Sequence, residues 1–130
     1  MINTDGSGLR QLTDLGSTGN VYTPAWAPDG RTIAFVRTSF ASPGNPDPAG
    51  KIWVMNADGS AQRRVADRPP DDHSPAWSPD GTRIVFASQD PSRGSAQALW
   101  LMNADGSAQG RLTAPRFHDG EPSWQPLPPR

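Results

Sequence analysis

The chain has 130 residues, a formal net charge of −1 and no cysteine. This length suits one ordinary domain, and a near-neutral charge without a basic block argues against nucleic-acid binding through phosphate attraction. The absence of thiols excludes disulfides and cysteine chemistry. Apolar runs span only a few residues, so we predict no signal peptide and no membrane-inserted segment.

Hydrophobic residues make up only 34% of the chain, alongside 13 Gly and 15 Pro. Such a composition by itself fits a disordered chain. Here, however, the apolar residues are gathered in short dense runs, and Gly and Pro fall between them. This distribution favours a folded domain of short strands joined by turns.

Two motifs recur along the chain. MNADGSAQ occupies residues 55–62 and 102–109, and INTDGSGL at 2–9 is an earlier copy. PAWAPDG begins at Pro24, PAWSPDG begins at Pro75, and EPSWQPLP at 121–128 is a decayed copy. A period of roughly 40–50 residues is typical of repeat architectures, including propeller blades.

Short segments rich in β-branched and aromatic residues, bounded by turn residues, are predicted to form strands. In chain order, the strands of the two complete sets are 23–27, 31–37, 51–55, 62–66, 74–78, 83–88, 98–102 and 109–113. Parts of a third and a fourth strand precede these sets and one first strand follows them, so we predict eleven strands. No segment shows a helical period of ten or more residues.

Both faces of the predicted strands are apolar. Ile33 and Phe35 point to one side, and Ala34 and Val36 to the other. Antiparallel sheets covered on both faces favour blades around an axis over a two-layer sandwich. We therefore predict an all-β fold: a β-propeller fragment with two complete four-stranded antiparallel blades plus parts of a third. We predict that residues 1–13 are the end of a preceding blade and that 14–66 and 67–113 are the two complete blades. Residues 114–130 are predicted to be the innermost strand of a further blade, followed by a tail.

Two kinds of connection are predicted at opposite ends of the blades. Tight turns of Pro-Asp-Gly and Asn-x-Asp-Gly join the first strand to the second and the third to the fourth. A calcium loop is an alternative reading of Asn-x-Asp-Gly, but the distal Glu that such a loop needs does not follow. Connections that vary in length or sequence lie at the other end: 14–22, 39–50, 67–73, 89–97 and 114–120. Because binding residues concentrate on loops held by a rigid scaffold, we expect a partner site at this end.

Candidate binding side chains are aromatic or charged residues of these variable connections. Phe40 and Phe117 each lie alone in such a loop and could anchor a partner. His73 and His118, with carboxylates nearby, would allow a divalent metal, but a polar rim is the reading we favour. The predicted partner-binding residues are Phe40, Asp47, Asp72, His73, Asp90, Arg93, Phe117, His118, Asp119 and Glu121. We predict no metal and no cofactor.

No catalytic residue is predicted. The run Asp72-His73-Ser74 contains the residue types of a hydrolase triad, but a triad needs groups that converge from distant segments. The Gly-x-Ser-x-Gly elbow and the Gly-rich phosphate loop are both missing from the sequence. The five tryptophans recur at fixed positions, so we expect them between blades rather than in a ligand cage.

The composite pattern PAWSPDG-x-x-I-x-F … IW-x-MN-x-DGS … RLT resembles the TolB-type β-propeller repeat, which is related in style to WD repeats. Similar repeats form the propellers of prolyl-oligopeptidase-like peptidases. The resemblance covers essentially the whole chain and implies about six blades in complete members, a protein-binding role, and a bacterial cell-envelope location. Three functions stay open: a noncatalytic protein- or peptide-binding scaffold, which we favour, a piece of a serine peptidase propeller, and a nonfunctional remnant.

The ends of the pattern predict a fragment of a larger propeller. Met1 aligns with Val54, partway into a third strand, and Pro126 follows the last Trp where an Asp-Gly turn would be expected. An incomplete ring exposes faces that neighbouring blades should bury. We therefore expect a homo-oligomer in which two chains approximate a six-blade ring with two gaps.

Overall fold

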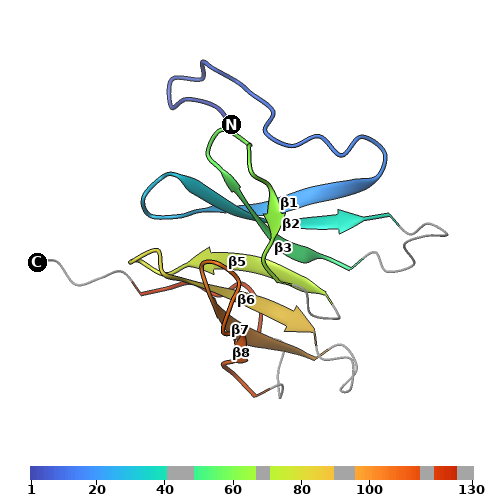
Figure 1. Cartoon of the computed structure of the whole chain (residues 1–130), viewed down its shortest axis with the longest axis vertical. Coiled ribbons are helices and arrows are strands. Elements are labelled where there is room, and N and C mark those ends of the chain that lie inside the picture. The colour runs from blue at the N-terminus through green and yellow to red at the C-terminus, as the bar shows by residue number, and fades with distance from the viewer. Residues whose placement is uncertain (41–48, 67–70, 90–95, 115–118, 126–130) are drawn as a thin grey trace, which may run out of the picture.

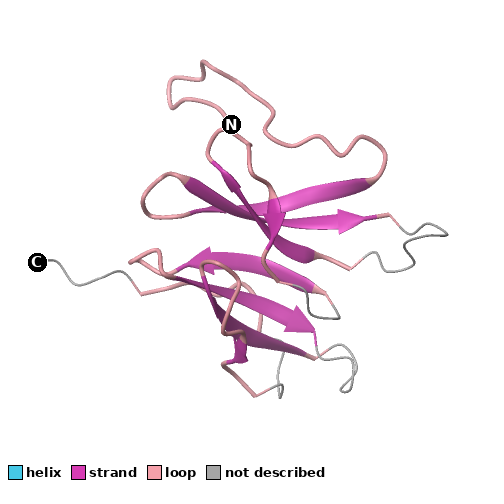
Figure 2. Ribbon diagram, viewed as in Figure 1, coloured by secondary structure: helices cyan, strands magenta, loops and turns pink. Residues whose placement is uncertain are grey.

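The computed structural model describes residues 1–40, 49–66, 71–89, 96–114 and 119–125. Within these ranges the chain forms eight strands in two sheets and no helix (Figures 1 and 2). The first sheet contains β1 (Gly19–Trp26), β2 (Thr32–Ser39), β3 (Lys51–Asn56) and β4 (Arg63–Arg64). The second contains β5 (Asp72–Trp77), β6 (Arg83–Gln89), β7 (Gln97–Asn103) and β8 (Gly110–Arg111).

Each sheet follows the chain in order, β1-β2-β3-β4 and β5-β6-β7-β8. Every neighbouring pair is antiparallel. This up-and-down order confirms the two predicted four-stranded blades, which we call the first and second blade. In the described part of the chain there is no helix with the length and hydrophobicity needed to cross a bilayer.

The first strand of each blade is interrupted by a bulge that the sequence analysis missed. Its pairing shifts register between Tyr22 and Ala25 in the first blade, and at the matching position in the second. Thr23 and Ser74 have φ angles of 48° and 53° there, and each precedes a proline. Proline has no N–H to donate to the neighbouring strand, so the ladder cannot continue through it. The strand therefore bulges and resumes beyond it.

Strand lengths also differ from prediction. β1 begins at Gly19, four residues before the predicted start, because the ladder extends beyond the bulge to Ser39 of β2. The fourth strands are only two residues long. In the first blade the N–H groups of Val65 and Ala66 both point at the Ile52 carbonyl, at 2.9 and 3.3 Å. One acceptor shared between two successive donors ends the regular ladder.

The Asn-x-Asp-Gly turns are held by their own side chains. Asp58 Oδ1 accepts hydrogen bonds from the backbone N–H and hydroxyl of Ser60, at 2.9 and 2.6 Å. These bonds lower the pKa of the Asp58 carboxyl below its usual value. Asp5 and Asp105 repeat the arrangement with the serine two residues on, and the pKa of each is lowered for the same reason. Turn chemistry thus accounts for the motif.

The Pro-Asp-Gly turn of the second blade holds its carboxylate with several hydrogen bonds. Asp80 Oδ1 accepts hydrogen bonds from the Ser78 hydroxyl at 2.6 Å and from the Thr82 N–H and hydroxyl at 3.0 and 2.8 Å. Led by the Ser78 hydroxyl, these donors lower the pKa of Asp80 from 3.8 to about 2. In the first blade Ala27 replaces Ser78, so the first of these donors is missing there.

Acid should therefore destabilise the second blade through Asp80. The carboxylate is favoured in the folded state, so its contribution is complete above pH 3.8 and is lost as pH falls toward 2. We expect Asp80→Asn and Ser78→Ala to flatten the fall of the urea midpoint between about pH 5 and pH 2.5. A slope unchanged in both variants would contradict this assignment.

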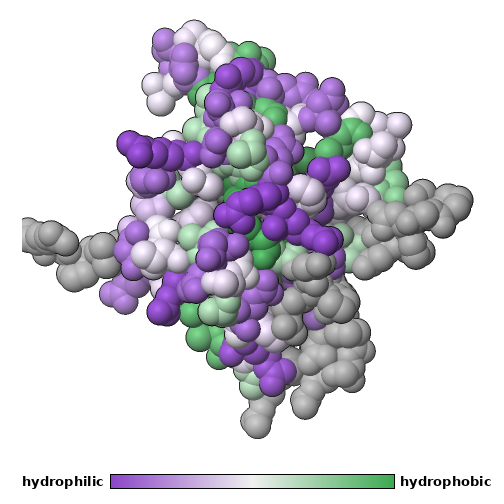
Figure 3. Space-filling model, in the orientation of Figure 1, coloured by the Kyte–Doolittle hydropathy of each residue, from purple (hydrophilic) through white to green (hydrophobic). Residues whose placement is uncertain are grey.

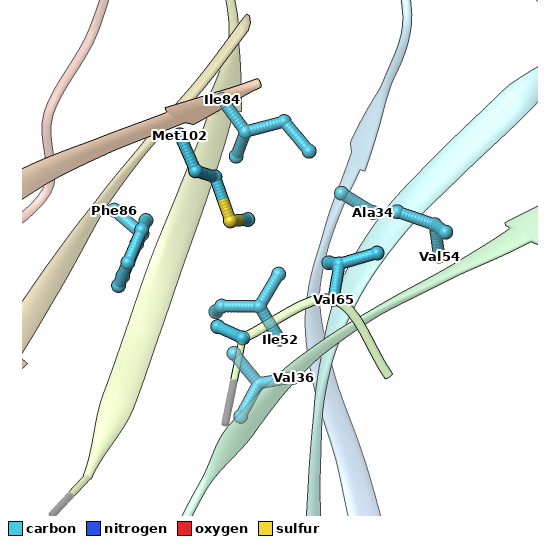
Figure 4. Packing of buried hydrophobic residues seen from close by; sticks show 9 residues of the cluster. Ala34, Val36, Ile52, Val54, Val65, Ile84, Phe86 and Met102 are labelled. Carbon is cyan, nitrogen blue, oxygen red and sulfur yellow. The ribbon is translucent and has the colours of Figure 1, made fainter. Parts of the chain in front are cut away.

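The two blades pack face to face through unlike surfaces. The second blade presents large side chains from β6 and β7, which we call its large-residue face: Ile84, Phe86, Trp100 and Met102. The first blade meets it with what we call its small-residue face: Ala34, Val36, Ile52 and Val54. Figure 4 shows side chains of both faces pointing toward one another between the sheets. This cluster is the main core of the described structure.

The outward side of the first blade repeats the large-residue face. It consists of Ile33, Phe35, Trp53 and Met55, and Leu12 and Val21 cover part of it. Trp53 also stacks beneath the Arg37 guanidinium, which lies 4.6 Å from the ring centroid. Trp53 lies on this outward face, on which Leu12 of the preceding repeat also packs, so its position agrees with a tryptophan between repeats.

Two tryptophans do tie neighbouring repeats together as predicted. Trp77 Nε1 donates to the Ala25 carbonyl at 3.1 Å, from the second blade to the first. Trp124 Nε1 donates to the Ala76 carbonyl at the same distance, from the last repeat to the second blade. Trp26, at the corresponding position in the first blade, is 48% exposed.

The terminal segments keep parts of the repeat without forming strands. Among the described residues, 1–18 and 119–125 contain no strand, so the prediction of eleven strands is wrong. Met1 and Arg10 nevertheless exchange backbone hydrogen bonds of 2.6 and 2.8 Å around the first Asn-x-Asp-Gly turn. Met1 and Arg10 thus pair across the turn as two residues of a β-hairpin do, but this single pair is too short to be a strand.

Candidate partner-binding rim

The end of the blades that carries the longer connections, which we call the long-loop rim, is joined across the two blades. Gly50, just before β3, accepts a 2.9 Å hydrogen bond from the Asp72 N–H. The Gly50 N–H in turn donates to Asp71 Oδ1. A Cβ at Gly50 would lie 2.8–2.9 Å from atoms of Asp71, Asp72 and Val36. Only glycine allows the two blades to approach this closely here.

Tyr22 and Asp71 meet at this junction. Burial raises the pKa of the Tyr22 hydroxyl, the negative charge of Asp71 raises it further, and a hydrogen bond with the Thr38 hydroxyl opposes the shift. Tyr22 remains 40% exposed. The sequence analysis missed Tyr22, although its alignment with His73 in the next repeat marks the same position on the first strand.

Phe40 lies on the same rim, directly after β2. Its N–H donates to the Thr18 carbonyl at 2.9 Å, while its side chain is 48% exposed. The backbone is thus fixed by the first blade and the ring is left available to solvent. A large apolar side chain held in this way suits an interface anchor.

The remaining described candidates take different positions. Asp72 is fully buried, which removes it from the side chains that a partner could contact. His73 is half-buried, with its Nδ1 3.1 Å from the Ser74 hydroxyl. Asp119 accepts a 2.7 Å hydrogen bond from the Thr113 hydroxyl, and Glu121 is exposed. Five predicted residues lie outside the described residues: Asp47, Asp90, Arg93, Phe117 and His118.

The described residues do not assemble a triad or a metal site. Asp72 and His73 are successive residues of β5, so their side chains point to opposite faces of the sheet. Within the described ranges no group of three or more His, Asp or Glu side chains is placed to hold a metal ion.

The opposite end of the blades, away from the rim where we expected a partner, carries a cleft. This cleft of about 360 Å³ lies between the short turns of the two blades, and its lining includes Pro28, Arg63, Trp77, Asp80 and Asp105. Arg63 bridges the blades there by donating to the Asp105 carbonyl at 3.1 Å. In Figure 3, hydrophilic residues cover much of the visible face and hydrophobic residues show only in small patches.

Two up-and-down four-stranded blades, packed face to face with repeated turns at one end, define a β-propeller fragment. The model of the family described as "TolB beta propeller domain" matches residues 1–128. The chain therefore belongs to the TolB β-propeller domain family.

Similar proteins include a Tol-Pal system protein and a peptidase. The Tol-Pal system protein TolB of Alcanivorax borkumensis is 34% identical over 82 residues, which are 63% of this chain and 18% of that protein. An uncharacterized peptidase, YuxL, of Bacillus subtilis is 36% identical over 62 residues, which are 48% of this chain and 8% of the peptidase. The chain thus spans less than a fifth of the length of either relative.

Solved structures agree on the fold. The crystal structure of TolB from Acinetobacter baumannii matches with a TM-score of 0.67 and 22% sequence identity, over 86% of this chain and 25% of that one. This likeness supports the propeller arrangement of the blades.

Proposed function

We propose that the chain is a noncatalytic TolB-type propeller module that binds a protein or peptide at the long-loop rim. The observation that carries this proposal is the pair of exposed aromatic rings, Tyr22 and Phe40, on a rim held rigid by the Gly50 junction. Exposed aromatic anchors on a fixed backbone are typical of protein-binding surfaces. The similarity to TolB proteins of the Tol-Pal system supports the same function.

The rim offers a mixed chemistry to a partner. The negative charge of Asp71 lies beside the Tyr22 hydroxyl, and Glu121 is exposed on the last repeat. A segment that places apolar side chains on the aromatic rings and a basic side chain near the carboxylates would complement this surface. Such a partner would pack against the ring of Phe40 and lose that contact when the ring is removed.

Phe40→Ala should weaken partner binding about tenfold or more, the loss expected when an interface anchor is truncated. Peptides can be selected from a random library against the wild-type chain and titrated into the isotope-labelled protein by NMR. We expect the largest shift changes at Tyr22, Phe40, Asp71 and His73. Leu112→Ala is the matched control, because Leu112 is also an exposed apolar side chain, at 59%, but it follows β8 in the second blade, whereas Phe40 follows β2 in the first. Shift changes confined to the short-turn cleft would contradict the rim as the binding surface.

The alternative function is that of a propeller piece from a serine peptidase. The 36% identity to a Bacillus peptidase favours it specifically. In such an enzyme the catalytic triad would lie in a separate hydrolase domain, and this chain would contribute only propeller blades. A hydrolase domain encoded in the same gene, together with peptide hydrolysis by its product, would support this alternative over the scaffold.

A further inference from the structure

The contact between the two complete blades has two parts that recur along the chain. In the first part, a tryptophan of one repeat donates to a first-strand carbonyl of the repeat before it, as Trp77 does to Ala25. In the second, an Asn-x-Asp-Gly turn lies on the end of the preceding fourth strand. Gly106 lies so close to the Val65 backbone that a Cβ would clash there, and Gln109 donates to the Val65 carbonyl at 3.1 Å.

Both parts are found again where the terminal segments meet the blades. Trp124 donates to Ala76 in the same way. At the other end, a Cβ at Gly59 would lie 2.9 Å from the Leu12 carbonyl oxygen, and Gln62 donates to that carbonyl at 3.4 Å. One set of contacts therefore holds each repeat to the one before it.

At each end of this series of repeats, one side of the repeat-to-repeat contact is present but the described residues do not supply the other side. Trp26 matches Trp77 and Trp124 but is 48% exposed, and no described residue accepts a hydrogen bond from its indole N–H. Leu112 matches Val65, which is 7% exposed beneath the Gly106 turn, yet Leu112 is 59% exposed. In the described structure, therefore, no strand carbonyl accepts from Trp26 and no turn covers Leu112.

Leu9 makes the two ends complementary to each other. It occupies the position of Gln62 and Gln109, whose side chains reach the preceding fourth strand. As a leucine it is 79% exposed, the largest exposed fraction among the large hydrophobic side chains described. An apolar residue at this position suits an apolar partner, and Leu112 provides one at the opposite end.

We propose that a second copy of this chain docks head to tail, so that the two copies build one shared blade. Residues 119–125 of one copy supply its innermost strand, and the hairpin formed by residues 1–13 of the other supplies its outer part. The Gly6 turn would then cover Leu112, Leu9 would pack on it, and the Trp26 N–H would donate to the Ser123 carbonyl.

The three contacts are mutually consistent because each follows the order of repeats seen within the chain. The Gly6 turn would lie on Leu112 as the Gly106 turn lies on Val65. The Trp26 indole would donate to the Ser123 carbonyl as the Trp77 indole donates to the Ala25 carbonyl. The shared blade has no counterpart of β2 or β6, so the junction depends on these contacts and not on a full strand ladder. A head-to-tail junction of this kind either closes into a ring or continues as a chain of copies. A pair closes if each copy makes both halves of the contact, and the pair is the assembly to which we commit.

The test uses two exposed positions whose substitution leaves both blade cores intact. Sedimentation equilibrium of the full chain at micromolar concentration should give twice the 13.9 kDa of a single chain. Leu9→Asp and Leu112→Arg alone should each weaken this association at least about tenfold. Mixing the two variants should restore it, because one junction then joins Leu9 to Leu112 and the other joins Asp to Arg. Phe40→Ala, on the long-loop rim, should associate like the wild type.

The same measurements can overturn the proposal. If the wild-type chain stays monomeric, the exposed contacts at its two ends do not bind a second copy, and the proposal is wrong. Further blades of a longer protein would then be the partners that cover them. A dimer that neither substitution weakens, or one that the mixture fails to restore, would show that the copies use another surface. Circular dichroism of both variants establishes that any loss of association occurs in folded protein.

Discussion

Replacing Phe86 with alanine should lower the free energy of unfolding by about 3–5 kcal/mol. Phe86 is fully buried in the centre of the contact between the blades. Its removal loses the apolar transfer energy of the ring and leaves a cavity that the facing sheet can fill only in part. A loss of this size is a large fraction of the roughly 5–15 kcal/mol by which native proteins are stable.

Urea unfolding followed by circular dichroism measures this loss, and Phe40→Ala is the control. Phe40 is 48% exposed, so its replacement should change stability by no more than about 0.5 kcal/mol. If Phe86→Ala cost as little as Phe40→Ala, the ring would not lie between packed sheets. Such a result would remove the main core of the proposed arrangement.

The second large effect is expected at Gly106, where alanine should cost roughly 2–5 kcal/mol. Part of this cost is backbone strain, because Gly106 has φ +93°, a conformation that side chains rarely adopt. The rest comes from the clash of the new Cβ with the Val65 backbone, which would push the turn of the second blade away from the first.

Gly6→Ala separates the two contributions. Gly6 has a similar φ of +84° in the same motif, but no atom lies within 4 Å of the position of its Cβ. In the single chain it should therefore cost only the strain, about 1–2 kcal/mol, so the comparison is made at a concentration at which the chain is monomeric. Equal losses in urea unfolding for the two variants would mean that the close approach of neighbouring repeats contributes nothing to stability.

The sequence predicts best those parts of the fold that depend on local residue patterns, namely the apolar strand segments and the Asp-Gly turns. The segment from Ile33 to Val36 is short, apolar on both faces and bounded by turn residues, which predicts a strand between two layers. The Asp-Gly turns carry their own hydrogen-bonding side chains, and the structure confirms them. Repetition then fixed the order of strands and the number of complete blades.

Features that depend on close approach between repeats could not be predicted in this way. The burial of Asp72 follows from its place beside Gly50 of the other blade, and no local pattern records that contact. Asp119, which follows Asp72 by one repeat of 47 residues, is only partly buried. The bulge before Pro24 was also missed, although proline after Thr23 was a signal that could have revealed it.

Exposure could be predicted from the sequence only for residues where it follows from their own position. Phe40 was expected as an isolated aromatic residue in a variable loop, and the structure places it exposed at the end of β2. Tyr22 was overlooked although it ends the variable connection 14–22, the kind of segment from which the other candidates were taken. Its exposure arises because the first strand reaches the long-loop rim beside Asp71. Predicting this exposure would have required the position of the next blade.

The central claim is that the two sheets are consecutive blades packed through the large-residue and small-residue faces. A NOESY spectrum of the methyl-labelled chain tests it most directly. We predict cross-peaks between the methyl groups of Ile84 and Met102 in the second blade and those of Ile52 and Val54 in the first. Cross-peaks confined to each sheet, with none between these two sets, would contradict the arrangement.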